Sequence, residues 1–454
     1  ALYTRSDGIV DFDNDRCIGC KSCMQACPYD ALYIDPNSHT AAKCNYCAHR
    51  LDGGYEPACV IVCPVEAIVS GDMDDPNSKI SDLLTNEKVM ARKPEKMTQP
   101  NLYYINGTNE MLDPNAAKPD WEYVWSEQSK GVGHYAKYAD KRVSESDTEN
   151  LLIQLAMENS ARSGKPLDQR SIDQVAKEIQ QDVDEKKARR VYDSPSKGVL
   201  WGWEVTSYVW TKAIATGTFL MMAIYQFING PLDHTVEISG LYTTLIFMGI
   251  TGALLIKDLD RPDRFLYVLL RPQWRSWLVR GAYIITVFGG LVTLLLINHY
   301  LDLGFYWVWS LGAVFAILGA IYTAFLFDQA RARDLWQTPW IGAIHMLVHA
   351  IIAGSVSMII IDPESIIIMR SILYFSILLN VLIIAKEVLM PHNTPDSKKA
   401  IQLMTNGYYS RYFWPGLILG SLLPFMILTA NTGFDLVAGL LALVGIFLTE
   451  FVRI

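Results

Sequence analysis

The chain has 454 residues, of which 51% are hydrophobic and 19% charged, and its net charge is −8 at pH 7. A chain of this length is expected to form more than one domain, and its acidic balance argues against nucleic acid as a partner. All eight cysteines lie between Cys17 and Cys63, so the N-terminal part is a chemically separate unit.

The first cysteine group has a tight and recognisable spacing. Cys17, Cys20 and Cys23 follow one another at three-residue intervals, and Cys27 comes four residues later, directly before Pro28. In this pattern three thiolates on one loop bind three irons of a cubane [4Fe-4S] cluster, while the fourth thiolate ligates a neighbouring cluster. The spacing therefore predicts two clusters.

The second cysteine group repeats this ending, with a longer insertion between its second and third thiols. The pattern assigns one set of ligands to each cluster: Cys17, Cys20, Cys23 and Cys63 to cluster 1, and Cys27, Cys44, Cys47 and Cys59 to cluster 2. Residues 27–32 and 63–68 share a Cys-Pro-x-acid-Ala-apolar sequence. This internal repeat predicts a ferredoxin-like α+β domain of two similar halves over residues 1–72.

Two other uses of the cysteines fit this pattern less well. A structural zinc site needs only two well-separated cysteine pairs, so the closely spaced triplet exceeds that requirement. Disulfides would suit an even count, but cysteines this crowded in sequence would cross-link a long chain poorly. Iron–sulfur clusters are favoured over both.

A polar connector is predicted over residues 73–200, where charges and prolines are too frequent for a membrane segment. Ser171 and Gln174 have the spacing of a capping box, which predicts the start of a solvated helix. That helix would run towards the basic cluster at residues 186–190.

From residue 201 to the end the chain is strongly apolar, which predicts an all-α membrane domain. A membrane-spanning helix needs about 20 residues, and tryptophans near the ends of several apolar stretches are typical of membrane interfaces. Eight stretches are long enough, giving an eight-helix bundle: 210–228, 239–256, 277–297, 306–327, 339–361, 366–384, 413–430 and 436–451.

The loop charges predict the orientation of this bundle. Lysines and arginines gather in the loops on the side of the cysteine domain: Lys257, Arg261, Arg264, Arg271, Arg275, Arg280, Arg331, Arg333, Lys386, Lys398, Lys399, Arg411 and Arg453. On the opposite side only Arg370 lies near a helix end. The positive-inside rule then places the cysteine domain in the cytoplasm. No export leader is visible before the cysteines, which agrees with that side, although Ala1 could follow a cleaved leader.

Several phrases of the chain resemble a known group of respiratory proteins. The cysteine quartets, together with VMARKPEKMTQPNLYY at 89–104, resemble the iron–sulfur electron-transfer subunits of polysulfide, tetrathionate and dimethyl sulfoxide reductases. The membrane half resembles their quinone-binding NrfD subunit, through KDLDRP at 257–262, SWLVRG at 276–281 and YTAFLFDQARARDLW at 322–336. The resemblance implies a fusion of these two subunits in a bacterial or archaeal cytoplasmic membrane.

This chain departs from the family in two respects. Family iron–sulfur subunits usually carry four clusters, whereas the cysteines here suffice for two. Family members often face the periplasm, which stays the alternative to the cytoplasmic side predicted from the loop charges. A shorter electron path, or one completed by another protein, is therefore expected.

The resemblance implies a quinone site within the first four helices, on the side of the iron–sulfur domain, with menaquinone or ubiquinone as substrate. Reduction of a quinone requires two electrons and two protons, and ionisable groups within a membrane domain are functional by default. The candidates for quinone binding or proton transfer lie at matching depth: Tyr208, Lys212, Asp258, Arg280, Tyr322 and Asp328. Structural alternatives are an ion pair between Arg280 and Asp258, and a Lys212 side chain that reaches the membrane surface.

His345 and His349 lie one helical turn apart and so share a helix face. A buried imidazole can ligate haem, but two residues of one helix cannot bind opposite faces of one haem, so a proton relay or a packing pair is favoured. Asp233, His234 and Glu237 lie on the opposite side, where they would either feed protons inward or merely be solvated.

Two functions remain open at this stage. The first is a membrane electron-transfer subunit that joins the clusters to the quinone pool for a catalytic partner, either a molybdopterin enzyme or a multihaem cytochrome. The second is a proton-translocating module of a quinol-oxidising respiratory complex. The sequence has no nucleotide-phosphate loop, nucleophile elbow or His-Glu-x-x-His motif, so the terminal substrate is expected to react in a partner subunit.

Overall fold

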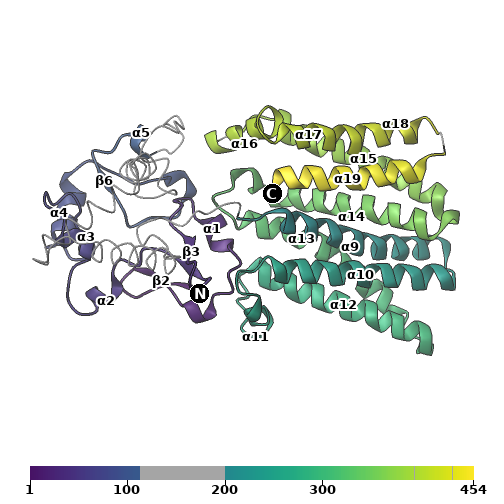
Figure 1. Ribbon diagram of the computed structural model, residues 1–454, viewed down its shortest axis with the longest axis horizontal. Coiled ribbons are helices and arrows are strands. Elements are labelled where there is room, and N and C mark those ends of the chain that lie inside the picture. The colour runs from purple at the N-terminus through teal and green to yellow at the C-terminus, as the bar shows by residue number, and fades with distance from the viewer. Residues whose placement is uncertain (113–199, 393, 432) are drawn as a thin grey trace, which may run out of the picture. The chain divides into compact units, whose positions relative to one another are not determined.

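The computed structural model describes residues 1–112, 200–392, 394–431 and 433–454. The expected connector helix beginning at Ser171 lies outside these residues, as does the basic cluster at 186–190. The remaining residues comprise a cysteine-bearing N-terminal domain and a helical C-terminal domain (Figure 1).

The N-terminal domain is built from short elements. Its strands form three two-stranded antiparallel sheets, pairing Leu2 with Phe12, Tyr33 with Ala42 and Val89 with Ile105. The strands are β1 (Leu2–Thr4), β2 (Val10–Phe12), β3 (Tyr33–Ile34), β4 (Ala41–Ala42), β5 (Val89–Met90) and β6 (Tyr104–Ile105). The helices are α1 (Ser22–Ala26), α2 (Ala48–Leu51), α3 (Ala58–Ile61), α4 (Lys79–Asn86) and α5 (Asn109–Leu112), with 3₁₀ turns at Asn14–Arg16 and Pro94–Lys96. The ferredoxin-like arrangement of two similar halves stays a prediction.

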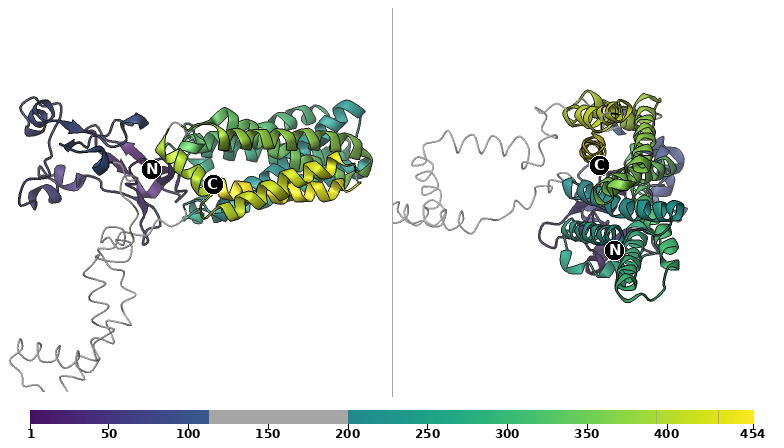
Figure 2. Two further views of the ribbon diagram at one scale, coloured as in Figure 1. Left: turned by 90° about the horizontal axis from the view of Figure 1, so that it is seen from above. Right: turned by 90° about the vertical axis from the view of Figure 1, so that its right-hand side faces the viewer.

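The C-terminal domain consists of long helices that lie side by side, as the view along their axes shows (Figure 2). The long helices are α9 (Trp203–Asn229), α10 (His234–Lys257), α12 (Trp277–Leu301), α13 (Trp307–Asp328), α14 (Pro339–Ile361), α15 (Ile366–Leu389) and α19 (Asp435–Arg453). Shorter helices are α11 (Tyr267–Leu270), α16 (Pro395–Thr405), α17 (Ser410–Leu417) and α18 (Leu423–Thr429), with 3₁₀ turns at Pro262–Arg264, Asp334–Trp336 and Pro363–Ser365. Each predicted apolar stretch coincides with a helix or with a continuous series of helices.

Seven of these helical segments are long and apolar enough to cross a membrane. α9 is not among them, although its 27 residues correspond to about 40 Å of helix. Buried Lys212 and several threonines make it less apolar, and almost every residue from Val205 to Met222 is buried against neighbouring helices. A helix enclosed by protein needs no lipid-compatible surface, which explains its lower hydropathy.

Small residues let α9 approach α14 closely. A Cβ atom at Gly217 would collide with the backbone around Ala350 and Gly354, and one at Gly354 would collide with the backbone of Gly217. Glycine at both positions therefore allows backbone-to-backbone contact, as is common between membrane helices. Around this contact, Phe219 stacks on Trp309 with ring centroids 5.1 Å apart.

The predicted stretch 413–430 is interrupted in the structure. α17 continues through a π-helical segment, Ile418–Leu422, into α18, and the Leu423 N–H bonds to the Ile418 carbonyl. Pro424 has no N–H to donate in the next turn, which favours this wider register. The segment still reaches the length of one membrane span.

Candidate functional site

The first cysteine quartet lies on a loop with two left-handed residues that leads into helix α1. Gly19 and Lys21 have left-handed backbones with φ of 69° and 57°, and α1 begins directly after Lys21. Cys23 lies on α1 and Cys27 ends it, so these two thiols are separated by one helical turn. Cys17 is buried, and its sulfur accepts a hydrogen bond from the Ala41 N–H at 3.3 Å.

The second quartet is built in a similar way. Cys47 has a left-handed φ of 51° and precedes α2, while Cys59 lies on α3 and Cys63 follows it. The Tyr46 N–H donates to the Cys44 sulfur at 3.4 Å. Backbone N–H groups of Ile68, Val65 and Ala67 lower the pKa of the Cys63 thiol, which favours the thiolate that a metal requires.

This donor set fits iron–sulfur clusters better than the alternatives. All eight cysteines are free, so the structure contains no disulfide among them. Within the described residues, which include every cysteine, no three thiols lie within 4.8 Å of one another. Four thiolates around one zinc ion would be about 3.8 Å apart, given Zn–S bonds of about 2.3 Å. The division of the eight cysteines between two clusters stays a prediction.

The loop of the first quartet contacts the helical domain directly. The indole N–H of Trp201 donates to the Cys20 carbonyl at 3.3 Å, and the Asp260 N–H donates to the Gly19 carbonyl at 3.3 Å. Further contacts are Arg264 Nη1 to the Asn14 and Cys17 carbonyls at 2.6 and 3.1 Å, Lys21 Nζ to the Asp258 carbonyl at 3.3 Å, and Arg333 Nε to Gln25 Oε1 at 2.6 Å. The loop that carries Cys17, Cys20 and Cys23 therefore lies beside the ends of α9, α10 and α13.

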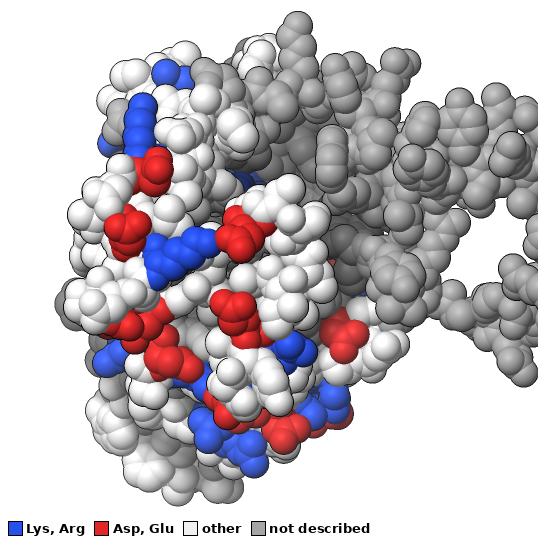
Figure 3. Space-filling view, turned by 90° about the vertical axis from the view of Figure 1, so that its left-hand side faces the viewer, with Lys and Arg blue, Asp and Glu red and all other residues white. Residues whose placement is uncertain are grey.

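The second quartet is more exposed to solvent than the first. Cys44 and Cys59 are exposed, and so are several large apolar side chains close to them in the sequence: Tyr55, Ile61, Val62, Val65 and Ile68. Elsewhere this domain carries positive and negative side chains interspersed (Figure 3), with ion pairs such as Arg5–Asp7 and Lys79–Glu66.

Three of the predicted quinone residues are deeply buried. Lys212 on α9 is 1% exposed, and its ammonium lies 4.4 Å from the ring centroid of Tyr322 on α13. Lys212 also donates to the Ala320 carbonyl at 3.2 Å and to the Thr323 hydroxyl. Tyr208, one turn before Lys212, is 3% exposed.

Gly281 on α12 completes this group. A Cβ atom there would lie 2.8 Å from Cζ of Tyr322 and closer still to two other ring atoms. The ring of Tyr322 therefore packs directly on the backbone of α12. We refer to Tyr208, Lys212, Gly281 and Tyr322 as the Lys212 group.

Among the described residues, Asp258 interacts electrostatically with Tyr208 of the Lys212 group, whereas Arg280 and Asp328 have other partners. Arg280 is exposed; its Nε donates to the Trp274 carbonyl at 2.6 Å and its guanidinium lies over Trp277. Arg280 therefore contacts Trp274 and Trp277, and the expected ion pair with Asp258 does not form. Asp328 is half-buried at the end of α13, where its carbonyl accepts from Gln337.

Asp258 caps the C-terminal end of α10, beside the first cysteine loop. Burial raises the pKa of its carboxyl group to about 7, with Lys21 opposing the shift. The side chain thus titrates near neutral pH at the junction between the two domains.

His345 and His349 do share one helix face, as the sequence predicts, but their partners were missed. Both Nε2 atoms face Asn380 Oδ1 on α15, at 2.9 and 3.1 Å. On α19, Glu450 Oε1 lies 3.3 Å from His349 Nδ1, and Arg453 Nη1 lies 2.6 Å from His345 Nδ1. Glu450 could have been suspected, since it is an acidic residue within a predicted membrane span. We refer to these five residues as the His345 cluster.

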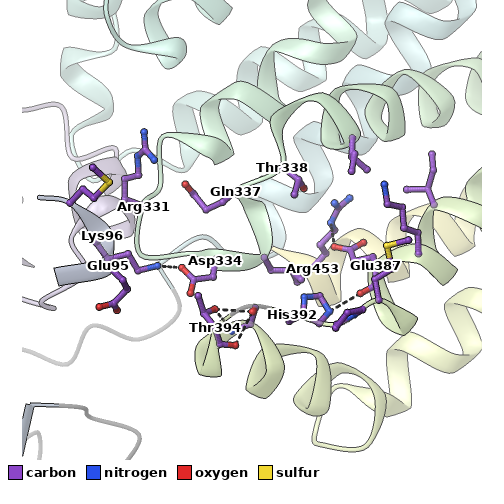
Figure 4. Close-up of a pocket in the computed structure, with 18 of the residues that line it drawn as sticks. Glu95, Lys96, Arg331, Asp334, Gln337, Thr338, Glu387, His392, Thr394 and Arg453 are labelled. Carbon is purple, nitrogen blue, oxygen red and sulfur yellow. Dashed lines mark hydrogen bonds and ion pairs between the residues drawn. The ribbon is translucent and has the colours of Figure 1, made fainter. Parts of the chain in front are cut away.

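A pocket of about 780 Å³ opens beside this cluster (Figure 4). Its lining combines charged and apolar side chains from residues 95–98, from residues 331–341, from the end of α15 and the start of α16, and from Arg453 on α19. Lys96 pairs with Asp334, and Arg453 Nε lies 3.2 Å from Glu387 Oε1. Arg453 thus belongs both to the pocket and to the His345 cluster.

The residues of the predicted far-side group contact their neighbours at the start of α10. Asp233 caps the helix by accepting the Thr235 N–H at 3.0 Å. His234 Nε2 lies 2.8 Å from His299 Nε2, whose ring pairs through Nδ1 with Glu237 at 3.1 Å.

Comparison with known proteins identifies both domains. A family model described as 4Fe-4S dicluster domain matches residues 1–73, and one described as Polysulphide reductase, NrfD, matches residues 193–454. The chain therefore has a dicluster iron–sulfur domain, and its seven apolar helices belong to a multi-pass membrane protein.

Similar proteins of known name match a smaller part of the chain. A tetrathionate reductase subunit of Salmonella typhimurium is 43% identical over 116 residues, 25% of this chain and 46% of that protein. A polysulfide reductase component of Wolinella succinogenes is 45% identical over 106 residues, which are 23% of this chain and 56% of that protein. Protein NrfC of Escherichia coli is 44% identical over 101 residues, which are 22% of this chain and 45% of that protein.

This chain spans about half the length of these relatives. Its membrane domain is matched over its whole described length by the second family model. The protein thus belongs to the NrfD polysulphide reductase family, with a 4Fe-4S dicluster domain fused to the family's membrane domain.

Proposed function

We propose that this chain carries electrons between two [4Fe-4S] clusters and a quinone that binds at the Lys212 group. The single observation that carries the proposal is the contact of the first cysteine loop with the helix ends that lead to this group. Trp201 donates to the Cys20 carbonyl, and its ring stacks on Trp336 at 5.8 Å and approaches Phe327 at 5.7 Å. The clusters would supply single electrons.

The Lys212 group supplies what a quinone carbonyl requires. The Lys212 ammonium is a hydrogen-bond donor held inside the bundle, and Tyr322 provides a second donor next to it. Since Gly281 lets α12 press against the ring, Tyr322 is held in one orientation. A developing negative charge on a quinone oxygen would be stabilised by these fixed donors.

The exposed second quartet is the proposed contact site for a catalytic partner. Exposed thiols and apolar side chains around Cys59 are typical of a surface that another protein covers. The relatives' names describe components of tetrathionate and polysulfide reductases, which supports a partner that acts on the terminal substrate. A molybdopterin enzyme or a multihaem cytochrome would fill that role, and the quinone would be menaquinone or ubiquinone.

The proposed topology has eight spans with the iron–sulfur domain in the cytoplasm. α9 is long enough to be the eighth span, because the hydrocarbon core of a bilayer is about 30 Å thick. The side is supported by the basic loops that adjoin the first cysteine loop, such as Arg261, Arg264 and Arg333.

The proposal is tested by replacing the buried donors. Lys212→Met and Tyr322→Phe should slow reoxidation of reduced clusters by added quinone, because each loses a donor without losing bulk. Thr218→Val is the matched control, since its hydroxyl bonds only the Ile214 carbonyl on the same helix. Wild-type rates in both variants would remove the Lys212 group from the quinone reaction.

A further inference from the structure

The His345 cluster is the most deeply buried ionisable group outside the Lys212 group in the described part of the chain. His345, His349 and Glu450 are 2%, 1% and 1% exposed, and Asn380 is 3% exposed. The cluster joins α14, α15 and α19, and nothing in the electron path described above uses it. Groups this costly to bury within a membrane domain call for a functional explanation.

Hydrogen-bond geometry fixes the protons of both imidazoles. Asn380 Nδ2 donates to the Ser421 hydroxyl at 3.1 Å, so the amide oxygen faces the two histidines. Each Nε2 must then carry a hydrogen to donate to that oxygen. In a neutral imidazole the other nitrogen, Nδ1, is an acceptor. His345 Nδ1 accepts from Arg453, which satisfies that ring.

His349 is left with a mismatch that one further proton would resolve. Its Nδ1 faces Glu450 Oε1 at 3.3 Å, and neither this nitrogen nor Glu450 Oε2 has a hydrogen-bond partner among the described residues. Two acceptors facing each other repel, whereas one proton between them makes a hydrogen bond, which is charge-assisted when the proton lies on His349 Nδ1 beside the Glu450 carboxylate. The His349–Glu450 pair is therefore built to hold and release one proton.

The pair is linked to a pocket through Arg453 and to the quinone candidates through Lys212. Arg453 lines the pocket and lies 3.8 Å from Glu450 Oε1, while Glu387, also in the pocket lining, holds Arg453 from the other side. On α9, Lys212 interacts electrostatically with Glu450. α9 and α19, which carry these two residues, are in direct contact, since the Trp210 indole N–H donates to the Leu443 carbonyl at 2.9 Å.

We propose that the His349–Glu450 pair is the proton donor and acceptor that serves the quinone, loaded through the pocket between Glu387 and Arg453. This inference rests on the proposed function. A quinone takes up two electrons and two protons to become a quinol, so the pair would deliver one proton with each electron and reload from water in the pocket. In quinol oxidation the same protons leave by the same route.

The permanent positive charge of Arg453 organises the residues of this route. An arginine side chain stays protonated in proteins, so it holds the cluster together without itself passing protons on. It compensates the charge of Glu450 when the pair has given up its proton. Lys212 does the same on the quinone side. His345, Glu387 and Asn380 are thus positioning residues, and His349 and Glu450 carry the proton.

A metal ion is the competing occupant of the same residues. Ligand atoms of His345, His349 and Glu450 lie within 4.8 Å of one another, which would suit a divalent cation. Arg453, however, places a positive charge 2.6 Å from the His345 nitrogen that would have to bind the metal. Haem ligation fails for a related reason, because both Nε2 atoms already face Asn380.

The test uses the purified full chain in liposomes, with its clusters reduced by a small artificial donor and reoxidised by a quinone analogue. Glu450→Gln and His349→Gln should each slow this step by roughly 100-fold, the lower end of what a positioned proton donor contributes. Thr449→Val is the matched control, because its hydroxyl bonds only carbonyls of α19. It should react at the wild-type rate.

A second readout separates proton transfer from a merely structural role. The infrared difference spectrum of wild-type protein upon quinone reduction should contain a carboxyl band that shifts in heavy water. Glu450→Asp should move this band, which assigns it even if Glu450→Gln does not fold. Quinone turnover in wild type with neither a Glu450 carboxyl band nor a band of the protonated His349 imidazole would overturn the proposal.

Two further results would also overturn it. One is a wild-type rate and an unchanged pH profile in folded Glu450→Gln, and the other is a stoichiometric metal besides iron that His345→Gln removes. A wild-type chain with no quinone-coupled step is a different outcome, because it would refute the proposed function itself. The two failures are therefore distinguishable.

Discussion

Gly281→Ala is the most informative substitution in the membrane domain, because it moves Tyr322 without touching a polar atom. The new Cβ would lie 2.8 Å from Tyr322 Cζ and closer to two other ring atoms. Carbon atoms pack at about 3.5–4.0 Å, and two ring atoms would lie closer than Cζ, so the ring must shift by well over 1 Å. Overpacking of this kind costs about 1–3 kcal/mol of stability. A 1 Å misplacement of a reacting group costs about 100-fold in rate.

The assay is reoxidation of chemically reduced clusters by a quinone analogue, with cluster content measured in the same sample. Gly289→Ala is the control on the same helix, since a Cβ there meets nothing within 4 Å. Any gain in helix preference is common to both variants and cancels in the comparison. A Gly281→Ala protein that is folded, fully loaded with iron and as fast as the control would refute the role of Tyr322.

Three more predictions concern the clusters, the membrane topology and pH. Cys27→Ser should damage cluster 2 rather than cluster 1 in electron paramagnetic resonance spectra, and the wild type should hold about eight irons and eight sulfides; zinc in their place would contradict the assignment. A reporter active only in the periplasm should stay silent when inserted at Pro391 and be active at Asn431; the reverse pattern would favour a periplasmic iron–sulfur domain. Burial raises the pKa of Asp258 to about 7. Between about pH 4 and pH 7 the folded protein therefore keeps a proton on this carboxyl group that the unfolded chain has lost. The protonated carboxyl group favours the folded state, and this stabilisation is lost as pH rises through about 7. Thermal unfolding from pH 5 to pH 8 should therefore show a smaller loss of stability in Asp258→Asn than in wild type, and equal losses would contradict the shift.

The cysteine domain and the helices could be predicted because their signals are local. Most of the cysteines within residues 17–63 are only three or four residues apart, so their spacing can be recognised in a short segment. A membrane helix is likewise recognised as one apolar stretch. α9 shows the limit of that second argument. Its polar residues face neighbouring helices, so its role depends on where the other helices pack.

The sequence was less informative about which way a helix faces. Arg280 and Gly281 lie at the same depth, yet Arg280 is exposed while Gly281 packs against Tyr322. Successive residues of a helix point in directions about 100° apart, so depth alone does not place a side chain in a site. The partners of His345 and His349 were missed for a further reason. Glu450 and Arg453 are about 100 residues away and join them only through the packing of α19 on α14.

The central claim is that one polypeptide passes electrons from its iron–sulfur domain to a quinone. Its most direct test is a stopped-flow measurement on the purified full chain, with the clusters reduced in advance and no partner subunit present. Addition of a quinone analogue should restore the absorbance of the oxidised clusters while quinol forms, with one quinol for every two electrons lost. Clusters that stay reduced in the presence of excess quinone would contradict the account.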